Sequence, residues 1–446
     1  MNLLINLHRM YALIVTALFL WSCDLPPSKT FNQTAESYRT LTDDGAWCWF
    51  SDPRAVHFRG KYNRTYAGWV DSTGNVVVGF YDHNSNQIQT KVVHANLQKD
   101  DHNNPALFVD AAGKLMLFYS KHADKDPMYL LNAKNPEDIS AWETRRELNL
   151  NDTITYAGLS DTYTYANICQ LSDENNRLYL FWRGADFKPN FSISDDQGKT
   201  WTQGKILILP ERIYRNRRPY YKIASNNKDV IHFAFTDGHP NAEPTNSIYY
   251  MRYHKGGLYK ANADKIADWS EYLQPRQADV VYDATKTNEK AWIWDIAENS
   301  NGDPVIVYSR FPNDTTHLYY YSTYDNNQWR SYKLVNSGKW FPQTPTGKKE
   351  TEQNYSGGIV LDHNNPSNIY LSRMKDGTFE IEKWTTPDKG KSWKTTSITA
   401  NSKFDNVRPF VVQHTTGDSV ILLWMNVQKY IHWTDYRSSI KMNIEK

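Results

Sequence analysis

Two stretches of this chain repeat the same eight-residue pattern, [Ser/Thr]-x-Asp-x-Gly-x-x-Trp. One copy runs from Ser194 to Trp201 and the other from Thr386 to Trp393. A degraded copy, from Ser322 to Trp329, keeps only the first and last residues of the pattern. Asp and Gly at these positions predict a tight turn between two strands. A turn that recurs at distant points of one chain indicates an architecture assembled from repeated units.

The segments between the turns have the pattern of short β-strands. From Asp43 onward, apolar runs of about four to eight residues alternate with clusters of Gly, Asn and Asp, which is typical of all-β proteins. Examples are 65–70, 76–81, 178–182, 230–235, 304–308 and 420–424. One segment, Asn135 to Trp142, is a candidate helix because Pro136-Glu137-Asp138 resembles a helix first turn.

The repeated pattern is similar to the Asp-box of BNR-type β-propellers, in which the Asp closes a turn within a blade and the Trp packs between blades. At about 55 residues per blade, the roughly 400 residues after the N-terminal segment give about seven blades. The resemblance therefore implies an all-β fold, a seven-bladed β-propeller in a single domain over residues 38–446.

The N-terminus has the pattern of an export signal over residues 1–22. Arg9 supplies positive charge and Tyr11 to Leu20 is an apolar segment too short to cross a membrane comfortably. Leu20-Trp21-Ser22-Cys23 resembles a bacterial lipobox, which implies lipidation of Cys23, with residues 23–37 as a flexible tether. We therefore expect a lipid-anchored protein of the cell envelope, on the outer membrane or cell surface of a Gram-negative bacterium. A plain secretory signal is the alternative.

Composition narrows the class of partner. The 51 basic and 49 acidic residues nearly balance, so no global field favours nucleic acid, and a polyanion would need a local cluster of cations. The 30 Tyr, 16 Trp and 17 Phe suit strands and surfaces that stack against sugars. In the mature chain Cys48 and Cys169 lie in apolar segments, so we expect buried free thiols, although one disulfide is possible.

Candidate catalytic residues begin with the stretch Asp100 to His122. His102 and His122 bracket a predicted hairpin, at points where apolar strands begin or end. Tyr165 and Arg183 lie at the ends of later strands. Strand ends deliver side chains to a binding surface. Candidate substrate-binding residues are Arg218, Tyr220, Lys222 and His239. Taken singly, each has a structural alternative: a turn or surface histidine, a packing tyrosine, a solvated arginine pair, or an Arg183–Asp186 ion pair.

Taken together, His, Tyr and Arg without a pair of catalytic carboxylates point away from ordinary glycoside hydrolysis. They suit β-elimination from a uronic acid. Arg and His can neutralise the substrate carboxylate, and a Tyr or His can move the protons. A cationic surround is expected to lower the pKa of the tyrosine.

Several phrases resemble the BNR-4 family of secreted propellers, from about Asp43 to the C-terminus. They lie at 47–56, 100–107, 163–167, 180–184, 218–220, 232–240 and 406–410. The family includes ulvan lyases, which cleave a sulfated rhamnose–uronate polysaccharide by β-elimination. The resemblance implies that His102, His122, Tyr165 and Arg183 form the catalytic site, with Tyr163 as an alternative to Tyr165. Arg183 and one histidine, preferably His122, would hold the carboxylate, while Tyr165 and His102 share the acid and base roles.

Two other classes compete with a lyase. One is a propeller hydrolase, a sialidase or a rhamnosidase. A sialidase could use Arg54, Arg310 and Arg408 as its three arginines, but it would leave the histidine pair idle. A non-catalytic glycan-binding lipoprotein could use Trp47, Trp49, Trp182 and Trp294 as stacking platforms. No His-x-x-x-His or paired-Cys pattern indicates a catalytic metal, so no cofactor is expected for the chemistry, while structural calcium or zinc stays open. We expect a monomer that binds an anionic sulfated polysaccharide and no nucleic acid.

Overall fold

The computed structural model of the chain describes residues 38–151, 162–415 and 419–445. The compact unit Tyr38–Lys446 carries the architecture set out below. Cys23 and the rest of residues 1–37 lie outside the described residues. No helix within the described ranges has the length and apolar character needed to span a membrane.

The strands form seven antiparallel sheets, the blades of a β-propeller. The first blade contains β2 (Ala55–Arg59), β3 (Asn63–Val70), β4 (Val76–Asp82) and β5 (Ile88–His94). The second contains β6 (Ala106–Val109), β7 (Leu115–Tyr119), β8 (Met128–Asn132) and β9 (Arg146–Leu148). The third contains β10 (Thr164–Leu171), β11 (Arg177–Arg183), β12 (Pro189–Ser194) and β13 (Lys205–Ile206). The larger fourth blade contains β14 (Tyr221–Ser225), β15 (Val230–Thr236), β16 (Ile248–His254), β17 (Gly257–Tyr259), β18 (Lys265–Asp268) and β19 (Asp279–Tyr282).

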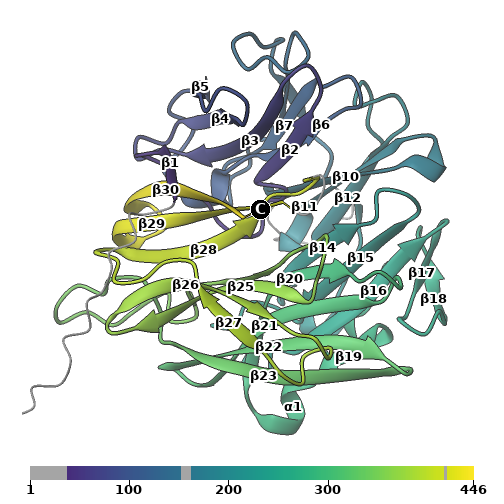
Figure 1. The fold of residues 1–446 in the computed structure, drawn as a ribbon. Helices are drawn as coiled ribbons and strands as arrows, with labels where there is room; N and C mark the ends of the chain where they lie inside the picture. Colours follow the sequence, from purple (N-terminus) through teal and green to yellow (C-terminus); the bar gives the residue numbers. More distant parts are fainter. Residues whose placement is uncertain (1–37, 152–161, 416–418, 446) are drawn as a thin grey trace, which may run out of the picture. The chain divides into compact units, whose positions relative to one another are not determined.

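The remaining blades complete the ring (Figure 1). The fifth blade contains β20 (Lys290–Glu298), β21 (Pro304–Asn313), β22 (Thr316–Asp325) and β23 (Gln328–Gly338). The sixth contains β24 (Ile359–Leu361), β25 (Asn368–Lys375), β26 (Thr378–Thr385) and β27 (Lys394–Ser397). The seventh contains β28 (Asp405–Val411), β29 (Val420–His432) and β30 (Asp435–Glu445) with β1 (Arg39–Thr42). Short helical turns are η1 (Asp101–Asn103), η2 (Ser172–Glu174), η3 (Ala185–Phe187), η4 (Arg212–Tyr214), η5 (Pro275–Gln277) and α1 (Ala284–Thr287).

Ring closure joins the two ends of the compact unit. β1 pairs antiparallel with β30, so the first strand of the unit completes the last blade. The inner strand β2 also bridges to Gln413, just after β28. These contacts explain why the purple and yellow strands lie side by side in Figure 1. The expectation of about seven blades is confirmed.

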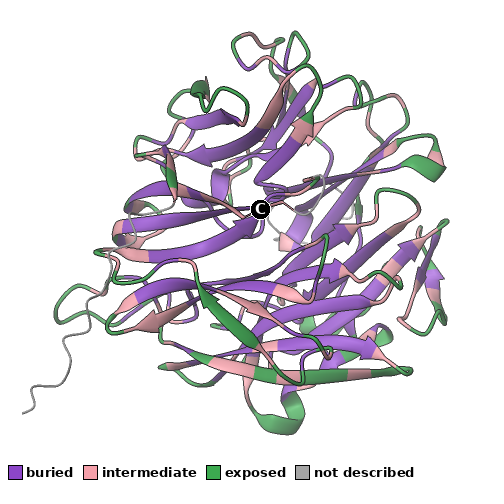
Figure 2. Ribbon diagram, viewed as in Figure 1, coloured by how far each residue is buried: buried purple, intermediate pink, exposed green. Residues whose placement is uncertain are grey.

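The inner strands of the blades are buried, whereas outer strands such as β5, β23 and β27 are largely exposed or half-buried, as are many connecting turns (Figure 2). Tryptophans are the largest of the fully buried side chains, and Trp49 stacks on Trp294 with ring centroids 4.4 Å apart. Trp47, Trp49, Trp182 and Trp294 are all at most 2 % exposed, so they pack the core and cannot serve as open stacking platforms. Cys48 and Cys169 are buried free thiols, as expected.

The candidate helix from Asn135 to Trp142 is wrong: this segment is a series of turns. Glu137 has a φ of 54°, in the left-handed region. Its carboxylate accepts hydrogen bonds from the amides of Lys61 (2.7 Å) and Tyr62 (2.9 Å) on the first blade. Contacts with a neighbouring blade thus replace the local helix signal of the Pro-Glu-Asp phrase.

Candidate functional site

A cavity of about 370 Å³ opens where the inner strands begin. Residues just before or at the start of inner strands supply one part of its wall, including His102, Tyr165, Tyr220 and Tyr355. Residues that follow the second strands supply another part: His122, Arg183, His239 and Trp433. The antiparallel blades bring these chain segments to one end of the central channel. The other lining residues are Cys48, Trp49, Phe50, Ala123, Phe187, Arg218, Asn241, Trp292 and Glu352.

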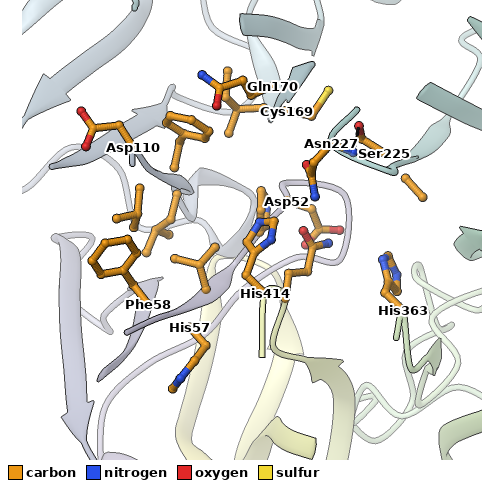
Figure 3. Close-up of a pocket in the computed structure, with 18 of the residues that line it drawn as sticks. Asp52, His57, Phe58, Asp110, Cys169, Gln170, Ser225, Asn227, His363 and His414 are labelled. Carbon is orange, nitrogen blue, oxygen red and sulfur yellow. Dashed lines mark hydrogen bonds between the residues drawn. The ribbon is translucent and has the colours of Figure 1, made fainter. Parts of the chain in front are cut away.

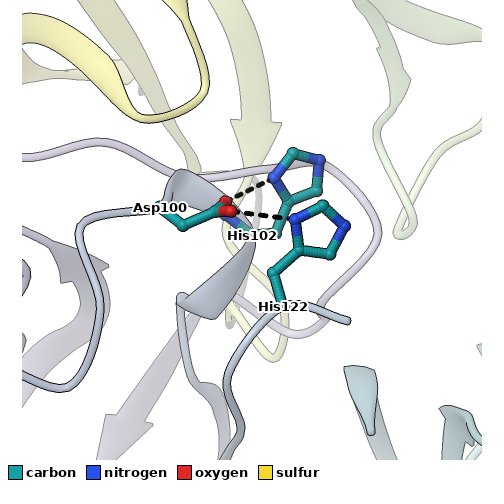
Figure 4. A group of neighbouring side chains, drawn as sticks. All are labelled: Asp100, His102 and His122. Atoms are coloured by element: carbon teal, nitrogen blue, oxygen red, sulfur yellow. Dashed lines mark hydrogen bonds and ion pairs between the residues drawn. The ribbon is translucent and has the colours of Figure 1, made fainter. Parts of the chain in front are cut away.

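One carboxylate, Asp100, holds two of the histidines that line this cavity, His102 and His122 (Figure 4). Its Oδ1 lies 2.6 Å from His102 Nδ1 and its Oδ2 lies 2.8 Å from His122 Nδ1. The two imidazoles stack with their centroids 4.1 Å apart. Potential metal-ligand atoms of these three side chains all lie within 4.8 Å of one another, so they could also hold an ion. With each Nδ1 directed at Asp100, each Nε2 is left for other partners.

The two histidines differ in charge because their surroundings differ. Burial disfavours the charged form of His102, but Cys48, Asp100 and Asp101 outweigh burial and raise its pKa well above the usual value. Burial and the neighbouring His102 lower the pKa of His122 to about 4. The pair therefore presents one imidazolium, His102, and one neutral imidazole, His122. The Nε2 of His102 lies 3.3 Å from the hydroxyl of Tyr355.

Tyr165 reaches the cavity through an irregular stretch of backbone. The register between β10 and β11 shifts between Thr164 and Asn167, and Tyr165 has a φ of 62°. A non-glycine residue in this region is strained by about 1–3 kcal/mol, and such strain gathers at functional sites. Burial raises the pKa of Tyr165 well above its usual value, although Arg183 acts in the opposite direction. The expected lowering of this pKa is therefore wrong, and the phenol carries its proton at neutral pH.

Arg183 is a buried cation, 4 % exposed, that pairs with no carboxylate in the described part of the chain. Its Nη1 donates to the hydroxyl of Tyr220 at 2.7 Å, and its guanidinium carbon lies 4.6 Å from the ring centroid of Tyr165. The alternative Arg183–Asp186 pair does not form, because Asp186 pairs with Lys188 at 2.9 Å. A buried charge without a counterion is costly, so this arginine is prepared for an anion from outside.

Of the candidate binding residues, three lie at the cavity and one does not. Tyr220 contacts Arg183 as above, His239 packs against Trp292 with centroids 4.6 Å apart, and Arg218 stacks on Phe187 at 3.8 Å. Lys222 lies two residues farther along the inner strand, where its ammonium is buried and pairs with Asp52 and the carbonyl of Trp49. The structure therefore places Lys222 inside the channel, in an internal ion pair.

Two residues of the site, Asp100 and Glu352, were not among the site residues predicted from the sequence. Asp100 directly precedes Asp101-His102, so its proximity in sequence was a usable signal. Glu352 lies in the long connection from β23 to β24 and is 6 % exposed. No described residue hydrogen-bonds to its carboxyl, and burial raises its pKa to about 7. No motif marks Glu352, because only the closed ring brings this connection to the cavity.

A second cavity, of about 300 Å³, lies at the opposite ends of the inner strands (Figure 3). His57, Cys169, His363 and His414 are among its lining residues. His363 pairs with Asp295 at 3.1 Å. None of the candidate catalytic residues lines this cavity, so it is separate from the site described above.

The arginines considered for a sialidase-type site do not converge. Arg54 pairs with Asp52, Arg310 with Glu289, and Arg408 with Asp101. None of the three lines the cavity that holds His102, Tyr165 and Arg183. Arg408 is fully buried and helps to fix the η1 turn that carries His102.

The fold and site define a seven-bladed β-propeller with a polar, partly cationic cavity at one end of its channel. The chain belongs to the BNR repeat-containing family (BNR_4), whose model matches residues 64–337, more than half of the 446 residues. A search of curated proteins found no match.

Solved structures show the same architecture. An ulvan lyase of polysaccharide lyase family PL25, bound to -[GlcA(1-4)Rha3S]-, is similar with a TM-score of 0.68 and 15 % identity over 90 % of this chain and 94 % of that chain. The polysaccharide lyase Uly1 is similar with a TM-score of 0.58 and 11 % identity over 91 % and 97 % of the two chains. At these identities the likeness establishes a polysaccharide-lyase-like propeller fold.

Proposed function

We propose that this protein is a polysaccharide lyase that cleaves ulvan, or a closely related sulfated rhamnose–uronate polysaccharide, by β-elimination. The observation that carries the proposal is the buried guanidinium of Arg183, which has no carboxylate partner among the described residues and lines the same cavity as His102, His122 and Tyr165. A uronate carboxylate would supply the missing counterion. The fold shared with an ulvan lyase supports the same class of substrate.

The charges within the site suggest a role for each residue. Arg183 and the His102 imidazolium neutralise the uronate carboxylate, which makes the C5 proton more acidic. The neutral His122 accepts that proton at Nε2, because its Nδ1 is held by Asp100. In this proposal His122 is the base and His102 binds the carboxylate. The two histidines thus have the reverse of the roles expected from the sequence.

The elimination then balances without a further reactant. The electrons of the C5–H bond form the C4=C5 double bond, and the C4–O bond to the leaving sugar breaks. Tyr165, protonated in the resting site, donates its proton to the leaving oxygen. After the reaction His122 carries the proton from C5 and releases it to solvent. The tyrosinate of Tyr165 takes up a proton from solvent, so both residues return to their resting states.

The test is to incubate the purified mature chain with ulvan and to follow the ultraviolet absorbance of the unsaturated uronate product. A parallel sample contains a metal chelator, because the Asp100, His102 and His122 donors could hold an ion. We expect the absorbance to rise with and without chelator, and the Tyr165→Phe variant to be slower by about 100-fold or more. Full activity of that variant would contradict the role of Tyr165 as acid.

A glycoside hydrolase is the second candidate, because Glu352 is a buried carboxyl whose raised pKa of about 7 suits a general acid. Among the described residues that line the cavity, Glu352 is the single carboxyl, and nearby Asp100 is engaged by both histidines. Hydrolysis by two carboxylates therefore has weaker support. New reducing ends without absorbance would favour the hydrolase over the lyase.

We also propose that the enzyme acts at the cell envelope through a lipid on Cys23, as the lipobox-like sequence suggests. The Cys23→Ala variant should leave the membrane fraction of a producing bacterium and become soluble. Retention of that variant in the membrane fraction would contradict the anchor.

A further inference from the structure

A third cavity, a cleft of about 590 Å³, is formed largely by the connection between β23 and β24, which also supplies Glu352 and Tyr355 to the catalytic cavity. We propose that this cleft, which we call the lysine cleft, is a distal subsite that binds the sulfated or carboxylated sugars of a polysaccharide away from the bond that is cleaved. Its cations are Lys339, Lys348 and Lys349. The proposal rests on the proposed function for the identity of the polymer.

The charges of the lysine cleft are free to meet a ligand. All three lysines are exposed, and none forms an ion pair with a carboxylate of the described chain. The ammonium of Lys339 lies over the ring of Trp340, 5.1 Å from its centroid, and both residues line the cleft. The excess charge and the indole together suit an anionic sugar chain.

The two carboxyls of the lysine cleft are already engaged. Glu350 is buried and accepts hydrogen bonds from the hydroxyl of Thr344 and, at 2.7 Å, from the amide of Glu352. Asp405 accepts a hydrogen bond from the amide of Phe379 at 2.9 Å. These contacts direct the carboxyls toward the protein, so the lysines set the charge that a ligand meets.

One connection, between β23 and β24, supplies residues to both the lysine cleft and the catalytic cavity. Phe341 in its wall stacks on Tyr355 in the cavity wall, with centroids 6.1 Å apart. Farther along, the same connection places Glu352 in the cavity. A polymer bound in the cavity can therefore extend into the lysine cleft without crossing a separate blade.

A second basic segment flanks the cavity over other blades. The connection between β13 and β14 carries Arg212, Arg215, Arg217 and Arg218, and Arg218 lines the cavity. Ile213 in this connection is 75 % exposed. The arginine segment enters the fourth blade, whereas the lysine cleft reaches the sixth and seventh blades at Met374 and Asp405. Arg217 already pairs with Asp237 and Glu243, so Arg212 and Arg218 are the exposed arginines that could hold a second part of the same polyanion.

The test compares a polymer with a short substrate. The triple variant Lys339→Ala, Lys348→Ala, Lys349→Ala is assayed on ulvan and on the shortest ulvan oligosaccharide that the enzyme cleaves. We expect the ratio of kcat/KM for ulvan to kcat/KM for the oligosaccharide to fall about tenfold at low salt, and the difference from wild type to shrink as salt rises. An unchanged ratio would overturn the proposal.

A matched control removes three lysines from the other end of the blades. Lys199, Lys228 and Lys255 are exposed and lie in turns after β12, β14 and β16, at the strand ends opposite the cavity. The variant Lys199→Ala, Lys228→Ala, Lys255→Ala has the same change in net charge, and we expect the wild-type ratio. An equal loss in this control would mean that net charge, and not the lysine cleft, determines the effect.

Binding is measured separately from turnover, by retardation of the Tyr165→Phe variant in gels that contain ulvan. Retardation that weakens when the three cleft lysines are removed supports the subsite, even if no uronate absorbance is ever produced and the lyase proposal fails. Lyase activity together with retardation that does not depend on these lysines overturns the subsite and leaves the lyase proposal intact.

Discussion

Asp100 is the residue on which the proposed catalysis depends most, although it does not line the cavity. Burial opposes its ionisation, but His102 and His122 hold its pKa below the usual range. One oxygen serves each imidazole, at 2.6 Å and 2.8 Å. Because the orienting partner fixes which nitrogen of a histidine is free, a shared partner fixes both rings together.

We therefore predict that Asp100→Asn lowers kcat by about 100-fold, because an amide cannot accept from both imidazoles and no longer favours the His102 imidazolium. The pH profile of kcat should shift as well, which a merely structural role would not cause. Steady-state kinetics on ulvan across pH measure both effects, and the melting temperature controls for folding. A lower rate with an unchanged pH profile would contradict the role of Asp100 in positioning and charge.

Arg183 is a buried cation that the proposed anionic substrate would neutralise. It is 4 % exposed, and its Nε has no hydrogen-bond partner among the described residues. We predict that Arg183→Met lowers kcat/KM by about 100- to 1000-fold. The same variant should raise the free energy of unfolding by about 1–2 kcal/mol, since it removes an uncompensated buried charge. Denaturant unfolding, measured beside kcat/KM, tests whether stability rises while activity falls. A loss of both activity and stability would assign Arg183 to the structural core.

The protonation state of Glu352 should make substrate binding depend on pH. Burial raises its pKa to about 7, and the groups that act on it are His102, Glu350, Asp101 and Arg408. Below that pH the carboxyl is neutral and can donate to a sugar; above it, the carboxylate repels an anionic chain. We expect KM for ulvan to rise several-fold from about pH 6 to about pH 8, and to rise much less in Glu352→Gln. The same rise in both proteins would assign the effect to another group.

At the scale of single elements, local turn chemistry could be predicted from sequence. Asp196 accepts from the amide of Thr200 at 2.8 Å and from its hydroxyl at 2.6 Å, and Asp388 makes the same pair of contacts with Ser392. All the partners of this turn lie within one pattern, so the pattern alone is enough. The candidate helix at Asn135 failed for the opposite reason, because Glu137 has its partners on another blade.

The catalytic cavity combines the two situations. His102, His122, Tyr165 and Arg183 line one cavity, and their grouping could be predicted from their places near strand ends together with the family resemblance. Lys222 could not be placed, because a shift of two residues along the inner strand moves a side chain from the cavity to the channel interior, where it meets Asp52. The place of Glu352 at the cavity could not be predicted for a similar reason, since its position depends on how blades distant in sequence meet.

At the scale of the whole molecule, the ring depends on one short strand. β1 contributes residues to the core through Leu41, which is 3 % exposed, and pairs with β30 through Arg39–Met442 and Thr40–Lys441. The amide of Gly45 continues this contact by donating to the carbonyl of Ser438 at 2.9 Å. Without β1, the last blade would present the open edge of β30.

We therefore predict that Leu41→Ala, which leaves a cavity in the core, lowers the free energy of unfolding by about 2–3 kcal/mol. A chain that begins after Thr42 should lose more stability and aggregate, whereas a chain that begins at Tyr38 serves as the reference. Because the seventh blade also holds Arg408, which pairs with Asp101 at 2.6 Å beside His102, lyase activity should disappear together with the ring. Thermal unfolding followed with activity measures this coupling. Activity that outlasts the loss of β1 would mean that the site is held by its own blades and not by closure of the ring.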